Sequence, residues 1–76
     1  MKERIKKVIK EKLEFDKIDL TDDDHIKEKL GLDSIDFLSL TVGIENEFGI
    51  EILDVEVNKE NFYSLKTLEK FIGGKL

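Results

Sequence analysis

The chain has 76 residues, no cysteine and a formal net charge of −5, which limits it to one small domain, residues 1–76, without disulfides, thiolate metal sites or a cysteine nucleophile. A domain of this size buries only about 60–65% of its unfolded surface, which leaves little room for an enclosed active site and argues against an enzyme. No apolar run approaches the roughly 20 residues of a membrane-spanning helix, and the basic start lacks the apolar stretch of a signal peptide. We therefore expect a cytoplasmic, non-catalytic protein with no stable membrane insertion.

Charge is distributed unevenly along the chain. Residues 1–15 carry six bases and three acids, residues 16–56 three bases and thirteen acids, and residues 57–76 four bases and two acids. The middle segment is therefore a concentrated negative field. Such a field repels nucleic acid and attracts basic protein surfaces.

The first predicted element is an amphipathic helix from Lys2 to Phe15. Its apolar residues fall within about 140° of arc at 100° per residue, and its outer face is basic. These apolar residues are Met1, Ile5, Val8, Ile9 and Leu13.

Residues 16–33 show no long period, and we expect a connection packed down by scattered apolar side chains. Thr21 and Asp22 are suited to cap a short helical turn, and Gly31 breaks the chain before the next helix. The acids 22–24 and His25 could suggest a metal site, but calcium loops place acids at alternate positions around a central glycine. We expect a solvated loop with His25 as a structural or surface residue, and no metal site.

The second helix is predicted from Ser34 to Phe48, with Asp33 as the N-cap, Asp36 near a capping box and Gly49 as the stop. It carries two apolar stripes. The core stripe comprises Phe37, Leu40, Ile44 and Phe48. A second group, centred about 130° away, comprises Ile35, Leu38 and Val42. Either the helix is buried deeply enough to cover both stripes, or the second is a docking face with Asp36, Glu45 and Glu47 as a charged rim.

Residues 50–58 alternate like a strand, but a single strand has no partner in a helical chain, and we predict a loop whose apolar residues cover the bundle. A short third helix is expected near Lys59–Phe62, capped by Asn58 or Asn61. The last helix is predicted from Leu65 to Ile72, capped by Ser64 and ended by residues 73–74. Its inner stripe comprises Leu65, Leu68 and Ile72. The fold class is therefore all-α, a small four-helix bundle with three longer helices and one short helix.

Ser34 lies at the first turn of the second helix, just after a glycine-containing loop. Unpaired backbone N–H groups at a helix start favour an anion, so a phosphate ester on this hydroxyl would lie in a favourable field. The simpler interpretation is that Ser34 only caps the helix.

The segment from Gly31 to Asp36, GLDSID, resembles the attachment motif of the acyl carrier protein family, commonly written G-x-D-S-[LI]. The motif lies at the right distance from both ends of an acidic helical chain of this length, so the resemblance covers nearly the whole chain. Further residues fall where the family has similar ones: Leu38, Leu40, Ile44, Glu45, Glu47, Phe48, Glu51, Ile52, Asp54 and residues 65–72.

The resemblance implies a function. A phosphopantetheinyl transferase would move 4′-phosphopantetheine from coenzyme A to Ser34, with Asp33 in a supporting role, and acyl groups would be carried as thioesters on the arm. Synthase, ligase or acyltransferase enzymes with basic docking patches would bind through Ile35, Asp36, Leu38, Val42, Glu45 and Glu47. The acyl chain would lie among Phe37, Leu40, Ile44, Phe48 and Leu68. A monomer suits such a shuttle.

The sequence also departs from the family pattern. Ser39 stands where fatty-acid carriers usually have an acid, and Lys29 stands where an acid is common before Leu-Gly. The pathway therefore stays open between fatty-acid or related lipid and polyketide biosynthesis and a specialised carrier of an aminoacyl, peptidyl or polyketide unit. A rival of another class is an unmodified acidic adaptor domain that binds partners through the second helix.

Overall fold

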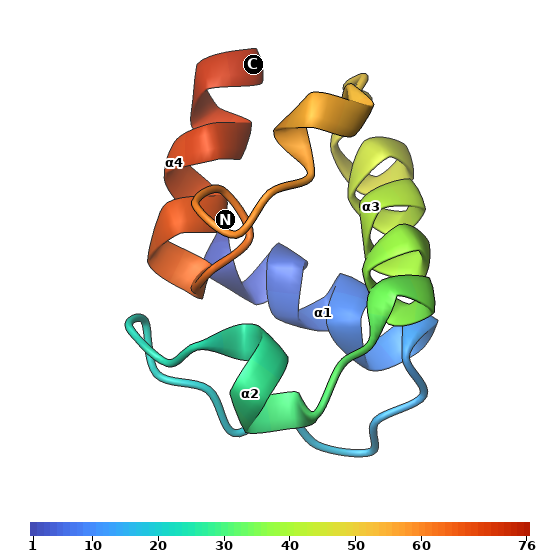
Figure 1. The fold of residues 1–76 in the computed structure, drawn as a ribbon, viewed down its shortest axis with the longest axis vertical. Helices are drawn as coiled ribbons and strands as arrows, with labels where there is room; N and C mark the ends of the chain where they lie inside the picture. The colour runs from blue at the N-terminus through green and yellow to red at the C-terminus, as the bar shows by residue number, and fades with distance from the viewer.

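The computed structural model describes residues 1–76, and it is all-helical with no strand (Figure 1). The elements are α1 (Lys2–Lys12), α2 (Ile26–Leu30), α3 (Ser34–Phe48), the 3-10 turn η1 (Asp54–Glu56) and α4 (Leu65–Lys75). The predicted all-α, four-helix class is confirmed, as is the expectation that residues 50–58 form no strand. None of the helices has the combination of length and apolarity needed to cross a bilayer.

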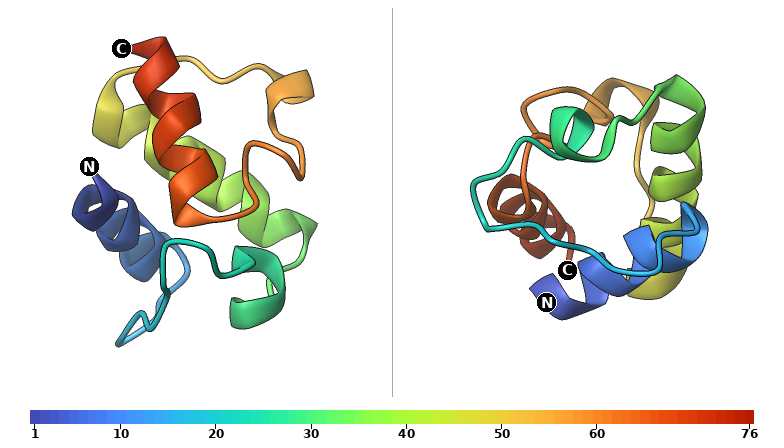
Figure 2. Two further views of the ribbon diagram at one scale, coloured as in Figure 1. Left: turned by 90° about the vertical axis from the view of Figure 1, so that its left-hand side faces the viewer. Right: turned by 90° about the horizontal axis from the view of Figure 1, so that it is seen from below.

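The helices enclose one small core. Helices α3 and α4 lie on opposite sides of the molecule, and α1 packs against both of them (Figures 1 and 2). The short α2 lies at the end of the molecule where α3 begins (Figure 1). The fully buried side chains are contributed by all four α-helices. They are Ile5, Ile9, Ile26, Leu40, Ile44, Leu65, Leu68 and Ile72.

Helix α3 has the predicted bounds because local signals define both of its ends. The Asp33 carboxylate accepts a hydrogen bond from the Asp36 N–H (2.9 Å), and the Asp36 carboxylate accepts one from the Asp33 N–H (3.0 Å). This reciprocal pair is a capping box. At the other end, Gly49 adopts a φ of 65° and its N–H donates to the Glu45 carbonyl, as a left-handed C-cap requires.

Two of the predicted helices end elsewhere. Helix α1 stops at Lys12 rather than Phe15, and Glu14 takes a positive φ of 57° that turns the chain. Helix α4 continues to Lys75 instead of stopping at Ile72. Its last turn is held from outside the helix, because the Lys75 ammonium donates to Glu56 at 2.6 Å.

The short helix was predicted in the wrong place. No helix forms at residues 59–62, which are a hydrogen-bonded turn in which Asn58 Oδ1 accepts from the Asn61 N–H at 2.8 Å. The short α-helix is α2 instead. It is fixed by tertiary contacts: Ile26 is fully buried, and its N–H donates to the Tyr63 carbonyl at 2.8 Å.

The turn before α2 also differs from the expectation. Thr21 and Asp22 do not cap a helix. Instead the Asp24 carboxylate accepts a hydrogen bond from the Thr21 N–H at 2.8 Å. This hydrogen bond from the Thr21 backbone lowers the pKa of the Asp24 carboxyl below its ordinary value. The Asp24 carboxylate thus stabilises the turn that leads into α2.

Candidate functional site

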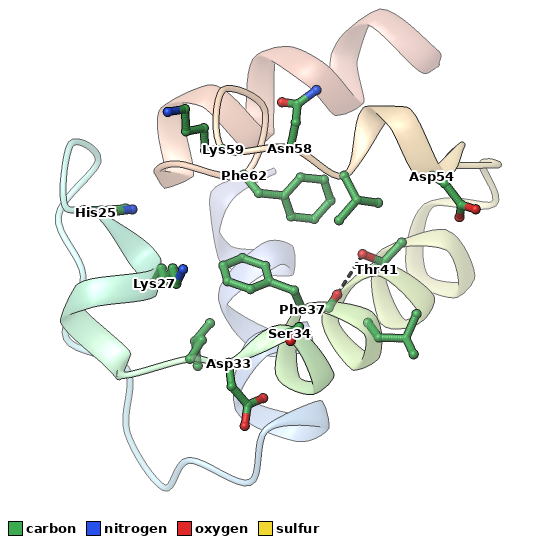
Figure 3. Close-up of a pocket in the computed structure, with 13 residues that line it drawn as sticks. His25, Lys27, Asp33, Ser34, Phe37, Thr41, Asp54, Asn58, Lys59 and Phe62 are labelled. Carbon is green, nitrogen blue, oxygen red and sulfur yellow. Dashed lines mark hydrogen bonds between the residues drawn. The ribbon is translucent and has the colours of Figure 1, made fainter.

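Ser34 is exposed at the first position of α3. The capping hydrogen bonds are made by its neighbours Asp33 and Asp36, so Ser34 is not the residue that caps the helix. Its side chain lies between Asp33 and Phe37 among the residues that line a groove (Figure 3). A bulky group can therefore be attached to this hydroxyl without unfolding the helix.

The backbone around Ser34 suits a phosphodiester on that hydroxyl. The first N–H groups of a helix lack intrahelical partners, and the helix dipole places partial positive charge there. The N–H of Asp36 already donates to the Asp33 carboxylate. The N–H groups of Ser34 and Ile35 therefore remain available to bind an anion. An exposed hydroxyl beside free N–H donors fits a phosphate-linked prosthetic group.

A groove of about 710 Å³ opens beside Ser34. Its walls come from α2, the start of α3 and the segment that joins η1 to α4 (Figure 3). Phe37 and Phe62 meet edge to face across its floor, with ring centroids 6.2 Å apart. The lining comprises His25, Lys27, Leu32, Asp33, Ser34, Phe37, Leu38, Thr41, Asp54, Val57, Asn58, Lys59 and Phe62.

The residues predicted to surround an acyl chain lie mostly in the core and not in the groove. Of the five residues predicted to surround an acyl chain, only Phe37 lines the groove. Leu40, Ile44 and Leu68 are completely buried, and Phe48 is nearly so. These side chains fill the core by packing on one another, so the open space lies beside the core and not within it.

The second apolar stripe of α3 faces outward. Ile35 is 73% exposed, Leu38 66% and Val42 45%. The alternative that α3 buries both stripes is therefore wrong. Two further exposed apolar residues, Leu53 and Val55, flank and begin η1. These two were not predicted, because the apolar residues of segment 50–58 were expected to cover the bundle.

The acids predicted as a rim have intramolecular partners. The Glu45 carboxylate accepts a hydrogen bond from the Ile52 N–H at 2.8 Å. Glu47 faces α1, where the Arg4 guanidinium donates to its carboxylate at 2.8 Å. This hydrogen bond lowers the pKa of the Glu47 carboxyl below its ordinary value. Glu47 thus lies on the α1 side of the helix, away from the exposed stripe.

The sequence did not predict that several of the groove residues would lie together. His25, Lys27 and Lys59 come from two segments more than 30 positions apart, and only the packing of α2 against residue 63 brings them together. The His25 ring stacks on Tyr63 with centroids 4.2 Å apart and an interplanar angle of 4°. No group of three or more His, Cys, Asp or Glu side chains is arranged to hold a metal ion.

Comparison with known proteins agrees with this arrangement. A family model described as the phosphopantetheine attachment site matches residues 3–73. Acyl carrier proteins from two strains of Buchnera aphidicola subsp. Acyrthosiphon pisum, Tuc7 and 5A, are each 43% identical over 61 residues, which is 80% of this chain and 76% of theirs. The chain belongs to the acyl carrier protein family. The prosthetic group of an acyl carrier protein is covalently attached 4′-phosphopantetheine, and the exposed hydroxyl at the start of α3 fits that group.

Proposed function

We propose that Ser34 is the attachment residue, and that residues 1–76 form one carrier domain that transports acyl groups in fatty-acid or related lipid or polyketide biosynthesis. The arm would supply a thiol, which this chain lacks because it has no cysteine. The single observation that carries the proposal is that Ser34 is exposed and that Asp33, rather than Ser34, caps the helix. The similarity to acyl carrier proteins supports acyl groups as the cargo.

Attachment is a phosphoryl-type transfer. A phosphopantetheinyl transferase would bring coenzyme A to Ser34, whose hydroxyl oxygen forms the new bond to phosphorus and loses its proton. The phosphorus–oxygen bond to the nucleotide breaks, and the nucleotide leaves with the electron pair. The free N–H groups of the first turn would stabilise the charge of the resulting phosphodiester. Asp33 would act by fixing the start of the helix, through its capping hydrogen bond to Asp36.

The attachment is tested by intact mass after incubation with coenzyme A and a phosphopantetheinyl transferase of broad specificity. The wild-type chain should gain one phosphopantetheinyl group, and Ser34→Ala should gain none. Ser39→Ala is the matched control, because Ser39 lies on the same helix without lining the groove, and it should gain one group. A wild-type chain of unchanged mass would favour the unmodified adaptor.

The exposed stripe would be the docking face for the transferase and the synthesis enzymes. An apolar centre in a charged surrounding suits a weak, transient interface, and thirteen of the chain's acids lie in residues 16–56. A partner with an apolar patch surrounded by basic residues therefore matches this face better than an acidic one. Asp36 borders the start of the stripe, whereas Glu45 and Glu47 would act mainly by holding neighbouring segments.

The docking face is tested with one pair of substitutions. Leu38→Ala should lower kcat/KM of the transferase about fivefold or more, since truncation of an interface anchor costs over about 1 kcal/mol. Leu76→Ala is the control, because Leu76 is 68% exposed against 66% for Leu38 and lies at the other end of the chain. Equal kcat/KM for the two variants would exclude Leu38 from the interface.

A further inference from the structure

A short segment of the chain separates two cavities. This wall segment, residues 53–62, contains η1 and the turn that follows it, and it lies between α3 and α4 (Figure 1). On one side of it is the groove beside Ser34, of about 710 Å³. On the other side is a cleft of about 490 Å³ between the wall segment and α4. With open space on both sides, the wall segment depends on a few specific contacts to keep its position.

The contacts of the wall segment with α4 are polar and directional. The Lys75 ammonium donates to Glu56 Oε1 at 2.6 Å, and the same oxygen accepts from the Leu53 N–H at 2.9 Å. At the other end, the Thr67 hydroxyl lies 3.1 Å from the Asn61 carbonyl oxygen, within hydrogen-bond distance. The Lys75–Glu56 pair is the shortest ion pair of the molecule, and its side chains are only 26% and 25% exposed. Such contacts hold one geometry and cannot slide.

The contact of the wall segment with α3 is apolar. Phe62 of the wall segment meets Phe37 of α3 edge to face, with ring centroids 6.2 Å apart. No hydrogen bond or ion pair joins residues 53–62 to α3. The Ile52 N–H, which donates to Glu45, lies just before the wall segment begins. Apolar surfaces can part around an alkyl chain without leaving a polar group unpaired, so the side of the wall segment that faces α3 opens at the lower cost.

We propose that Glu56 and Lys75 form a latch that fixes the wall segment to α4. An acyl chain that enters the bundle then parts the wall segment from α3, at the seam between Phe37 and Phe62. The inference rests on the proposed attachment at Ser34, and it adds two positioning residues that determine how firmly the cargo is held. Neither latch residue lines the groove, so the latch acts through the wall segment and not by contact with the cargo.

The seam separates the groove from the core. Phe62 belongs to the buried core, and Phe37 packs against it. Parting the two rings therefore gives a chain attached at Ser34 a continuous apolar path from the groove into the core. Each methylene group that leaves water stabilises the inserted chain. A long acyl chain thus offsets the cost of parting the rings, whereas an acetyl group does not reach far enough to do so.

The latch preorganises one side of the opened site. While it is closed, the wall segment and α4 move as one body, and a chain held between them and α3 is covered by a fixed surface. Without the latch, the wall segment can also swing across the cleft, because η1 is not packed extensively on any helix. The inserted chain then loses part of its cover, and its thioester is exposed for more of the time.

The test measures the reactivity of the thioester with a long and a short cargo. The transferase loads the chain from octanoyl-coenzyme A or acetyl-coenzyme A, and intact mass verifies loading. Hydroxylamine then cleaves each thioester. The cleavage rate for the same acyl group on free pantetheine, divided by the rate on the carrier, gives the shielding of that cargo. In the wild-type chain, octanoyl should be shielded more than acetyl.

Breaking the latch should lower the shielding of octanoyl alone. Loss of one partly exposed ion pair changes a population roughly 1.4- to 5-fold. Lys75→Gln and Glu56→Gln should each reduce octanoyl shielding by that factor and leave acetyl shielding unchanged. The double variant should lose no more than either single variant, because the two side chains form one pair. Lys75→Arg retains the positive charge, and it should retain the shielding.

The matched control is Lys2→Gln. Lys2 lies 3.6 Å from Glu69 of α4 and 3.1 Å from Asp22, so this variant removes ion pairs that also hold α4 to a neighbouring segment. It does not alter a contact of the wall segment. Octanoyl shielding should therefore stay at the wild-type value in Lys2→Gln, although the substitution is of the same kind as in Lys75→Gln.

Amide NMR spectra of the loaded wild-type chain identify the side that opens. The Leu53 N–H donates to the latch carboxylate, so its resonance reports on the side that faces α4. The amides of Phe37 and Phe62 report on the seam. Replacing acetyl by octanoyl should shift the two seam amides and leave the Leu53 amide in place.

Other outcomes overturn the inference in distinguishable ways. Equal shielding of octanoyl and acetyl in the wild-type chain, or octanoyl shielding that both latch variants retain, refutes the latch and leaves the proposed function intact. A loss that Lys2→Gln shares shows a general effect of stability, and higher shielding in the latch variants shows that the pair opposes entry; either result refutes the latch. A shift of the Leu53 amide without a shift at the seam places the opening beside α4. A chain that never gains mass refutes the proposed function itself.

Discussion

Gly43 of α3 lies close against α1, and its replacement by alanine should destabilise the protein. A Cβ atom at this position would lie 2.6 Å from Val8 Cγ1 and 2.7 Å from Lys12 Cγ. Lys12 is exposed and can move its side chain. Val8 is only 5% exposed and is packed in the core, so the strain of the substitution falls mainly on the contact with Val8.

The sign of the effect depends on two opposing magnitudes. Alanine is favoured over glycine inside a helix by about 0.8–1.0 kcal/mol, whereas overpacking a close-packed core costs roughly 1–3 kcal/mol. For Gly43→Ala the net expectation is therefore destabilisation of up to about 2 kcal/mol. Gly73 lies inside α4, and apart from its chain neighbours and the nearby backbone of α4 itself, no atom lies within 4 Å of the position that a Cβ atom would take there. Gly73→Ala should therefore be stabilising by up to about 1 kcal/mol.

Thermal unfolding, monitored by circular dichroism, distinguishes the destabilisation expected for Gly43→Ala from the stabilisation expected for Gly73→Ala. A change of 1 kcal/mol shifts the Tm by roughly 4–8 °C in a domain of this size, so the two variants should move in opposite directions. Combining Gly43→Ala with Val8→Ala should be less destabilising than the sum of the two single changes, since the second removes the methyl that clashes. If Gly43→Ala raises the Tm as much as Gly73→Ala, the close approach of α1 and α3 is wrong.

Two single interactions and the overall charge distribution lead to further predictions. Lys75 lowers the pKa of the Glu56 carboxyl below its ordinary value of 4.5 through their hydrogen bond, so this stabilisation is fully present above about pH 4.5 and is lost as the pH falls through the lowered pKa. Glu56→Gln should therefore lower the Tm at pH 7, and the difference from the wild type should shrink as the pH is lowered below 4.5. Ser64 Oγ accepts a hydrogen bond from the Thr67 N–H at 3.2 Å, so Ser64→Ala should lower the free energy of unfolding by about 1 kcal/mol, measured in urea. Raising salt from low ionic strength to about 0.15 M should raise the Tm, since it screens repulsion within residues 16–56, and a Tm insensitive to salt contradicts that charge model.

The parts of the fold that could be predicted are those that local chemistry determines. Asp33, Asp36 and Gly49 define α3 through contacts within four residues of the helix ends, and Ser64 does the same for the start of α4. Such signals are visible in the sequence because the interacting groups are neighbours in it. Ser34 could be proposed as the attachment residue for the same reason, since it belongs to a short contiguous motif.

The parts that could not be predicted depend on partners far along the chain. A five-residue helix such as α2 shows no period, and it forms here because Ile26 is buried and bonded to the Tyr63 carbonyl. The last turn of α4 continues through two glycines because Lys75 is held by Glu56. The groove has the same origin, because its walls are two segments that meet only after the core has formed.

The exposure of the second apolar stripe of α3 follows from where α1 packs on this helix. A glycine inside a helix is unfavourable on its own, and at Gly43 it is required because Val8 lies where a side chain would be. Glu47, one turn later on the same side, pairs with Arg4 of α1. At 100° per residue, Gly43 is about 110° from the centre of the second stripe. Helix α1 therefore covers the side of α3 away from Leu38, and the apolar stripe stays open on the same helix that presents Ser34.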